Sequence, residues 1–221
     1  MNDPRYHSMD GEDGLSSGEQ PCDPRLHAPA TQRNREPILD VLSRVLPGSG
    51  IVLELASGTG EHAIWLAQHL RPLVWQPSDA DPDMRRSIDA HARLAGARNI
   101  RPALAIDVTS RPWPIEFASA AVCVNLLHIS PWTATEGMFA GCAEILPAGA
   151  PIAIYGPFKR HGQHTAESNA RFDSSLRASD SSWGVRDVDD VSTVAERHGF
   201  VLEEIVEMPA NNLILVFRRQ G

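Results

Sequence analysis

The stretch Ile51-Val-Leu-Glu-Leu-Ala-Ser-Gly-Thr-Gly-Glu-His-Ala63 decides the fold of this chain. Its first six residues are mostly apolar, which is typical of a parallel strand covered on both faces. A glycine turn follows, and residues 61–70 then carry apolar side chains at helical spacing. A strand, a glycine loop and a helix in this order fit the pattern G-x-G-x-x-G/A, in which the backbone closely approaches a nucleotide-like cofactor.

The rest of the chain alternates between predicted strands and helices. The spacing of apolar residues predicts helices over residues 31–46, 61–70, 83–94, 133–146 and 187–198. It predicts strands over residues 51–56, 73–76, 101–107, 120–127, 151–155, 201–208 and 213–218. Such alternation indicates an α/β fold with a Rossmann-like, doubly wound and mostly parallel sheet of about seven strands. The last two strands have no helix between them, so they must form an antiparallel C-terminal hairpin.

Length and composition favour a single domain preceded by a short leader. The chain has 221 residues, of which 42% are hydrophobic and 22% charged, so one large core is feasible. Residues 1–24 are rich in Asp, Glu, Gly, Ser and Pro, which indicates a disordered leader. We expect one domain over residues 25–221, with an irregular active-site insertion at about residues 156–184 that holds one short helix.

Several partner classes are disfavoured. No apolar stretch approaches the ~20 residues that cross a membrane, and the N-terminus lacks a signal-peptide pattern. The net charge of −8 argues against a nucleic-acid surface. Three widely spaced cysteines, Cys22, Cys123 and Cys142, indicate a reducing cytoplasm and no disulfide framework. We therefore expect a cytoplasmic protein whose partner is a small molecule, while its oligomeric state stays open.

The charge of the glycine loop distinguishes two cofactors. A dinucleotide places its pyrophosphate at the helix N-terminus, where a carboxylate would repel it. Here Glu61 directly follows the second glycine, and Glu54 lies near the end of the preceding strand. S-adenosylmethionine has no phosphate and carries an ammonium and a sulfonium, which carboxylates attract. We expect this cofactor at Glu54, Ser57, Gly58 and Gly60, with a dinucleotide as the alternative.

Polar residues at other strand ends extend the predicted cofactor site. Asp79 comes nineteen residues after Gly60, at the position that pairs with ribose hydroxyls in Rossmann sites. Asp107 ends the predicted third strand, where a carboxylate can accept a hydrogen bond from an adenine amino group. Each acid is otherwise a solvated loop residue or a helix N-cap. Asn125, late in the fourth strand, either contacts the cofactor or is a hydrogen-bonded strand amide.

Short segments distributed along the chain carry a family resemblance. They are Arg33-Asn34, Glu54-Leu-Ala-Ser-Gly-Thr-Gly60, Trp75-Gln-Pro-Ser-Asp79, His128-Ile-Ser-Pro-Trp132, Tyr155-Gly-Pro-Phe158, Trp183-Gly-Val-Arg-Asp187 and Met208-Pro-Ala-Asn-Asn212. From about Leu26 to Arg219 the chain resembles a family of uncharacterised methyltransferases that includes methyltransferase-like protein 26. This resemblance implies the class I methyltransferase fold and S-adenosylmethionine binding, but no substrate. We expect Arg33, in the first segment, to contact the cofactor.

Two residues at strand ends are candidates for removing a proton from a methyl acceptor. His128 follows the fourth strand, and its ordinary pKa of ~6.5 suits proton removal near neutral pH. Its alternative role is to orient the cofactor loop or to cap the next helix. Tyr155 ends the fifth strand and is the second candidate, with hydrogen bonding or stacking as its other role.

Further residues are candidates for the acceptor pocket. Trp132 either walls this pocket or fills the core. Asn211 and Asn212 lie in the predicted final hairpin, where asparagine also suits a simple turn. The basic run Lys159–His164 either binds an anionic group, with His164 as a ligand, or is a solvated loop. Its two histidines lack the third ligand that catalytic zinc needs, so no metal is expected.

Taken together, these patterns predict S-adenosylmethionine-dependent methyl transfer to a small-molecule acceptor. Two other classes of function stay open. The first is a module that binds the cofactor without catalysis, which a filled acceptor pocket would favour. The second is an NAD(P)-dependent oxidoreductase, which titration with both cofactors would identify.

Overall fold

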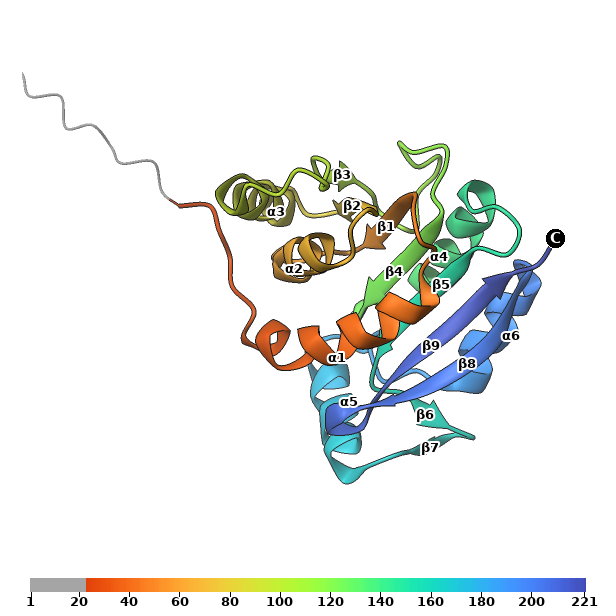
Figure 1. The fold of residues 1–221 in the computed structure, drawn as a ribbon. Coiled ribbons are helices and arrows are strands. Elements are labelled where there is room, and N and C mark those ends of the chain that lie inside the picture. The colour runs from red at the N-terminus through yellow and green to blue at the C-terminus, as the bar shows by residue number, and fades with distance from the viewer. Residues whose placement is uncertain (1–22) are drawn as a thin grey trace, which may run out of the picture.

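The computed structural model describes residues 23–221. The predicted leader lies outside these residues apart from Asp23 and Pro24, which have no regular secondary structure. Within the described part of the chain, seven strands form one sheet with helices on both faces (Figure 1).

The sheet has the strand order β3-β2-β1-β4-β5-β9-β8. The strands from β3 to β5 are parallel, whereas β9 is antiparallel to both of its neighbours. The predicted doubly wound sheet with an antiparallel C-terminal hairpin is therefore confirmed. The strands are β1 (Ile51–Leu55), β2 (Val74–Asp79), β3 (Leu104–Ala105), β4 (Ala120–Val124), β5 (Pro151–Gly156), β8 (Phe200–Met208) and β9 (Asn212–Arg219).

Helices cover the two faces of the sheet in separate groups. One face is covered by α1 (Pro29–Val45), α2 (Glu61–His69) and α3 (Pro82–Ala95), and the other by α4 (Trp132–Ile145) and α6 (Val188–Arg197) (Figure 1). Consecutive strand residues point to opposite faces. In β5, for example, Tyr155 joins the core beneath α1 and α2, whereas Ile154 joins the core beneath α4 and α6. Burial on both faces explains why the central strands are continuous apolar runs in the sequence.

The segment 156–184 is more regular than the sequence indicated. It contains a small hairpin, β6 (Lys159–Arg160) and β7 (Gln163–His164), followed by the 13-residue helix α5 (Glu167–Ser179). The one helix expected in this segment is present but longer than expected, and it buries the polar residues Asn169 and Asp173 beside Leu176. In Figure 1, α5 lies beyond the C-terminal ends of β4 and β5.

Two strands are shorter than predicted. The expected strand 101–107 forms only β3, so Asp107 lies in the turn that follows it. The expected strand 120–127 ends at Val124, because Asn125 adopts a left-handed conformation with φ of 63° and starts a 3-10 turn, η1 (Leu126–His128). A second 3-10 turn, η2 (Pro209–Asn211), connects β8 to β9.

Candidate functional site

The loop after β1 has a left-handed backbone at Ala56, Gly58 and Gly60, with φ of 52°, 56° and 92°. A Cβ atom added to Gly60 would lie 2.7 Å from the Cα of Ile88, so this glycine allows α3 to pack closely. A Cβ atom added to Gly58 would have nothing within 4 Å. The two glycines therefore differ: Gly60 serves packing, and Gly58 exposes backbone to open space.

Glu54 is a buried carboxyl group just before this loop. Its side chain is 1% exposed, and its Oε2 accepts a hydrogen bond from Trp75 Nε1 at 2.8 Å. Burial raises the pKa of Glu54 to about 7, although hydrogen bonds from Trp75 and Ser57 oppose this shift. At neutral pH the group is thus balanced between its neutral and charged forms. A cation held nearby would favour the charged form.

Asp79 connects the end of β2 to the glycine loop. Its Oδ2 accepts a hydrogen bond from the Gly58 N–H, and its Oδ1 accepts one from the Asp81 N–H, both at 2.9 Å. The Ser57 N–H also donates to the Ser78 carbonyl oxygen at 2.8 Å. Burial raises the pKa of Asp79, and the two backbone donors oppose this shift. The strand β2 therefore fixes the shape of the loop.

Glu61 contacts the segment that precedes α1. Its Oε2 accepts hydrogen bonds from the Ala28 N–H at 2.6 Å and the Thr59 hydroxyl at 3.2 Å. Its Oε1 lies 3.1 Å from His27 Nδ1. The charge argument from the sequence treated Glu61 as facing a cofactor cation. In the structure this carboxylate instead binds residues 27 and 28, which precede α1.

Asp107 lies apart from the glycine loop. It is exposed, and its Oδ1 accepts hydrogen bonds from the backbone N–H and the hydroxyl of Thr109, at 2.8 and 2.7 Å. It lines a cavity of about 270 Å³ together with Ala80 and Arg85, which follow β2. Asp79 is thus the last residue of β2, whereas Asp107 lies two residues beyond the neighbouring strand β3 and does not end it as predicted.

A cavity of about 440 Å³ lies over the ends of β4 and β5. We call it the amide-lined cavity, because asparagine side chains contribute much of its wall. It brings together four residues that the sequence singled out: Arg33, Asn125, Tyr155 and Asn212. The sequence analysis assigned no role to its other lining residues, which are Asn34, Pro157, Asn169, Phe172, Pro209 and Ala210.

Asn34 of α1 connects the amide-lined cavity to α2, the helix that follows the glycine loop. His62, in the first turn of α2, places its Nε2 2.8 Å from Asn34 Oδ1. Tyr155 lines the cavity beside Asn34, and the Asn125 N–H donates to the Tyr155 carbonyl oxygen at 2.9 Å. Burial raises the pKa of Tyr155 above its ordinary value. Its surroundings therefore favour a neutral, hydrogen-bonding phenol over a base.

His128 is packed inside the protein. Its side chain is 1% exposed and meets the ring of Phe158 edge to face at 4.7 Å between centroids. Its Nδ1 accepts a hydrogen bond from the Arg186 N–H at 3.2 Å. The proton of the neutral ring must then be on Nε2, so neither nitrogen has a free lone pair. Burial, with the nearby charge of Arg186, lowers the pKa of His128 to about 3. These contacts favour an orienting role over a general base.

Three predicted acceptor-site residues lie outside the walls of the amide-lined cavity. His164 places its Nε2 3.3 Å from Asp173 Oδ2. Asn211 is exposed and supports the cavity from outside, because its carbonyl oxygen accepts a hydrogen bond from Asn169 Nδ2 at 2.9 Å. Trp132 lines a different cavity. Sequence order alone could not separate these residues, because all of them follow strand ends.

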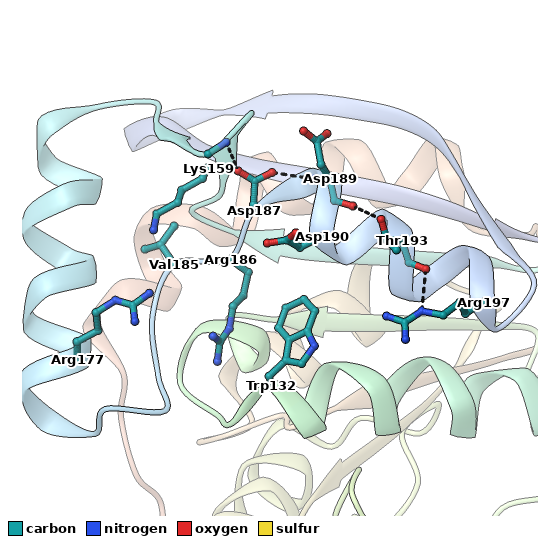
Figure 2. A pocket seen from close by; sticks show the side chains of 11 residues that line it. Trp132, Lys159, Arg177, Val185, Arg186, Asp187, Asp189, Asp190, Thr193 and Arg197 are labelled. Carbon is teal, nitrogen blue, oxygen red and sulfur yellow. Dashed lines mark hydrogen bonds between the residues drawn. The ribbon is translucent and has the colours of Figure 1, made fainter.

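Trp132 contributes to a larger cavity of about 720 Å³, the Trp132 cavity (Figure 2). Figure 2 shows Arg186 beside its indole, and the guanidinium carbon lies 5.5 Å from the ring centroid. Arg186 also donates to the carbonyl oxygens of Leu127 and Ser130, at 2.9 and 2.6 Å. This arginine therefore clamps the turn that holds His128. The cavity is lined by Trp132, Lys159, Gly162, Arg177, Val185, Arg186, Asp187, Asp189, Asp190, Thr193 and Arg197.

Asp173 anchors α5 to the segments on either side of it. Its carboxylate accepts a hydrogen bond from the Val185 N–H at 2.7 Å and lies 3.2 Å from Lys159 Nζ and 3.1 Å from Arg177 Nε. Burial alone would raise the pKa of Asp173, but these partners hold it below its ordinary value. Asn169 precedes Asp173 by one helical turn. The anchor therefore positions a residue that lines the amide-lined cavity.

We expect Asp173→Ala to lower the free energy of unfolding by about 1–3 kcal/mol, because it leaves buried donors without their acceptor. Urea unfolding followed by circular dichroism measures this loss. Asp180→Ala, at an exposed acid after α5, is the matched control and should change stability far less. Equal stabilities of the two variants would show that Asp173 does not anchor the helix.

In residues 23–221 no helix is both long and apolar enough to cross a membrane. The same residues contain no cluster of three or more His, Cys, Asp or Glu side chains that could hold a metal ion.

Comparison with known families gives one match. Residues 25–219 match the family described as "Protein of unknown function (DUF938)". The match spans nearly all of the described chain, and its description carries no reaction. The resemblance to methyltransferase-like protein 26 therefore stays a prediction.

Solved structures with a similar fold include several methyltransferases. CalO1, a methyltransferase of calicheamicin biosynthesis in its S-adenosylhomocysteine-bound form, is 17% identical, with a TM-score of 0.67 over 84% of this chain and 54% of that one. An O-methyltransferase family 2 protein from Planctomyces limnophilus in complex with apigenin is 16% identical, with a TM-score of 0.73 over 86% and 57%.

A third similar structure is NcsB1, an O-methyltransferase of neocarzinostatin biosynthesis, in complex with S-adenosylmethionine and 2-hydroxy-5-methyl naphthoic acid. It is 13% identical, with a TM-score of 0.69 over 86% of this chain and 54% of that one. The chain thus spans little more than half the length of these three structures. At these identities the likeness is one of fold.

Proposed function

We propose that this chain, which belongs to the DUF938 family of proteins of unknown function, catalyses S-adenosylmethionine-dependent methyl transfer to a small-molecule acceptor. The family description names no reaction, so the proposal rests on the site. One observation carries this proposal. The amide-lined cavity, which has room for a small molecule, lies next to α2, the helix that begins directly after the glycine loop, because its wall residue Asn34 contacts His62 of that helix. The neighbouring fold of CalO1, described with bound S-adenosylhomocysteine, supports the same cofactor.

The residues at the loop fit the cofactor. The open side of Gly58 allows close backbone approach, and Glu54 offers a carboxyl group that a cation would ionise. We assign Asp79 to the ribose and Asp107 to the adenine, because Asp79 ends β2 and Asp107 lies just beyond the C-terminal end of the neighbouring strand β3. Arg33 is the one cationic side chain among the described residues of the amide-lined cavity, and it suits the carboxylate of the methionine part. The remaining proposed contacts are Ser57, Gly60 and Asn125.

When bound, S-adenosylmethionine supplies an electrophilic methyl group on a sulfonium. The residues of this chain then act chiefly by orienting the acceptor and excluding water. Tyr155 offers a neutral phenol at the cavity wall. His128 supports the turn after β4 through its contacts with Arg186 and Phe158. Neither residue is needed as a base if the acceptor releases its proton to bulk solvent after the methyl group has been transferred and the product has left the cavity.

Calorimetric titration of the full chain with S-adenosylhomocysteine, and separately with NAD, tests the cofactor assignment. We expect saturable binding of the first and none of the second. Incubation with methyl-labelled S-adenosylmethionine and a mixture of small metabolites should then transfer label to one of them. Tight NAD binding without a response to S-adenosylhomocysteine would overturn the assignment. Cofactor binding without transfer to any metabolite would favour a cofactor-sensing module.

A further inference from the structure

Asn169 presents an oxygen atom to the amide-lined cavity. Its Nδ2 donates to the Asn211 carbonyl oxygen at 2.9 Å and to the Thr165 hydroxyl oxygen at 3.1 Å. A carbonyl oxygen can only accept hydrogen bonds, so the first contact fixes which way the amide points. Asn169 is buried, and within residues 23–221 no donor reaches its Oδ1. A molecule in the cavity would satisfy this oxygen by donating from an O–H or N–H group.

Asn212, the residue after Asn211, repeats this arrangement in the same cavity. Its Nδ2 donates to the Pro209 carbonyl oxygen at 3.1 Å, which again fixes the amide. Its Oδ1 receives no hydrogen bond from the described part of the chain. Two carbonyl oxygens from separate elements, α5 and the start of β9, therefore line one cavity. Both oxygens can accept hydrogen bonds from a molecule that enters the cavity.

An aromatic side chain lies beside these oxygens. Phe172 follows Asn169 by three residues on α5, so the two side chains lie on the same side of the helix. Phe172 lines the cavity and is 43% exposed, although a large apolar ring is normally buried. Pro157 and Pro209 add further apolar wall. These surfaces suit a flat ring.

The charge of the cavity disfavours a cationic occupant. No carboxylate is among the described residues that line it. A buried cation without a counter-ion is costly, so an ammonium group would be excluded. Arg33 offers a positive charge, but the proposed function assigns it to the cofactor. The cavity then favours an uncharged occupant.

We propose that the methyl acceptor is an uncharged aromatic molecule that carries hydroxyl or amino groups. Its ring packs on Phe172, and Asn169 and Asn212 accept hydrogen bonds from its O–H or N–H groups. This inference rests on the proposed function and specifies the acceptor class of the same site. It also makes Asn169 and Phe172 specificity residues, which the sequence analysis did not identify.

The test compares four simple probes on the full chain saturated with S-adenosylhomocysteine. Resorcinol is neutral and carries two donors, and 1,3-dimethoxybenzene has the same ring without a donor. Benzoate and benzylamine supply a negative and a positive charge. Ligand-observed NMR or calorimetry ranks their affinities. We expect resorcinol to bind about 5–30-fold more tightly than 1,3-dimethoxybenzene, the range for one or two neutral hydrogen bonds, and benzylamine not to bind.

Two variants connect this preference to the named residues. Phe172→Ala should weaken resorcinol binding by about 3–10-fold through loss of ring contact. Phe117→Ala removes another exposed phenylalanine, which lies before β4 away from the cavity, and should change nothing. Asn169→Ala should reduce the preference for resorcinol over 1,3-dimethoxybenzene to about 5-fold or less, because Asn212 then supplies the one remaining acceptor oxygen. Its melting temperature and S-adenosylhomocysteine affinity are measured first, to establish that the variant is folded.

The outcomes separate this inference from the proposed function. Failure of the wild-type chain to bind S-adenosylhomocysteine overturns the function itself. Binding of S-adenosylhomocysteine with preferential binding of benzylamine or benzoate leaves the function intact and overturns the acceptor class. Equal affinity for resorcinol and its dimethyl ether in the wild-type chain also overturns it.

Discussion

Gly58→Val is expected to abolish S-adenosylhomocysteine binding while the domain still folds. The added side chain would project from the loop into open space, where nothing in the protein lies within 4 Å. It would therefore obstruct a ligand rather than the core. Blocking backbone approach should weaken binding by roughly 100-fold or more, since a loss of about 2.7 kcal/mol suffices. Valine at a φ of +56° also carries a conformational cost of about 1–2 kcal/mol.

Gly149→Val is the control that distinguishes obstruction of the ligand from backbone strain. Gly149 has a φ of +79°, and its added Cβ would also have nothing within 4 Å. It precedes the N-terminal end of β5, whereas Gly58 follows the C-terminal end of β1. Both variants should lose similar stability in thermal unfolding. Only Gly58→Val should lose the calorimetric signal for S-adenosylhomocysteine. If both variants bind like wild type, the loop is not the cofactor site.

The stability of the protein should fall steeply in acid because His128 is held neutral. Its pKa is about 3 in the folded state, against 6.5 as its ordinary value, so the unfolded chain binds the proton first as the pH falls. The contribution of His128 to stability is therefore full above pH 6.5 and is lost progressively toward pH 3. At pH 4 the loss should be about 3 kcal/mol, at 1.36 kcal/mol per pH unit. His62, whose pKa burial lowers to about 4, acts in the same direction.

His128→Gln tests this origin, since glutamine cannot take up the proton. Urea unfolding at pH values between 4 and 7 should show a shallower loss of stability for this variant than for wild type. His69→Gln, at an exposed histidine of α2, serves as the control and should follow the wild-type curve. A pH dependence that is identical in all three proteins would mean that His128 is accessible to protons in the folded state.

The sequence predicted the sheet well because the burial of each central strand is evident from its own run of apolar residues. Residues 51–55 are nearly all apolar, and residues 52–55 are indeed buried on both faces. The final hairpin followed from chain connectivity alone. The glycine loop was found because its backbone geometry needs glycine at Gly58 and Gly60. These features depend on neighbours in sequence or on general rules of sheets.

The side-chain environments could not be predicted in the same way. His128 and Tyr155 both follow strands, yet only Tyr155 lines the amide-lined cavity. The burial of His128 depends on Arg186, which is 58 residues away in the chain. In the sequence, Asn169 is one polar residue of a segment predicted to be irregular. Only its contact with Asn211 in the structure shows that its side-chain amide has a fixed orientation. Such contacts depend on the tertiary structure.

The place of β9 in the sheet also bears on how the chain is made. During synthesis β5 emerges from the ribosome more than fifty residues before β9, the strand that will cover its outer edge. Until residues 212–219 emerge, the nascent chain exposes the edge of β5, a row of unpaired backbone groups that invites association with other chains. The strand β8 is synthesised earlier, yet it reaches the sheet only through β9. Chaperone protection should therefore matter most after β5 has been synthesised and before β9 has been.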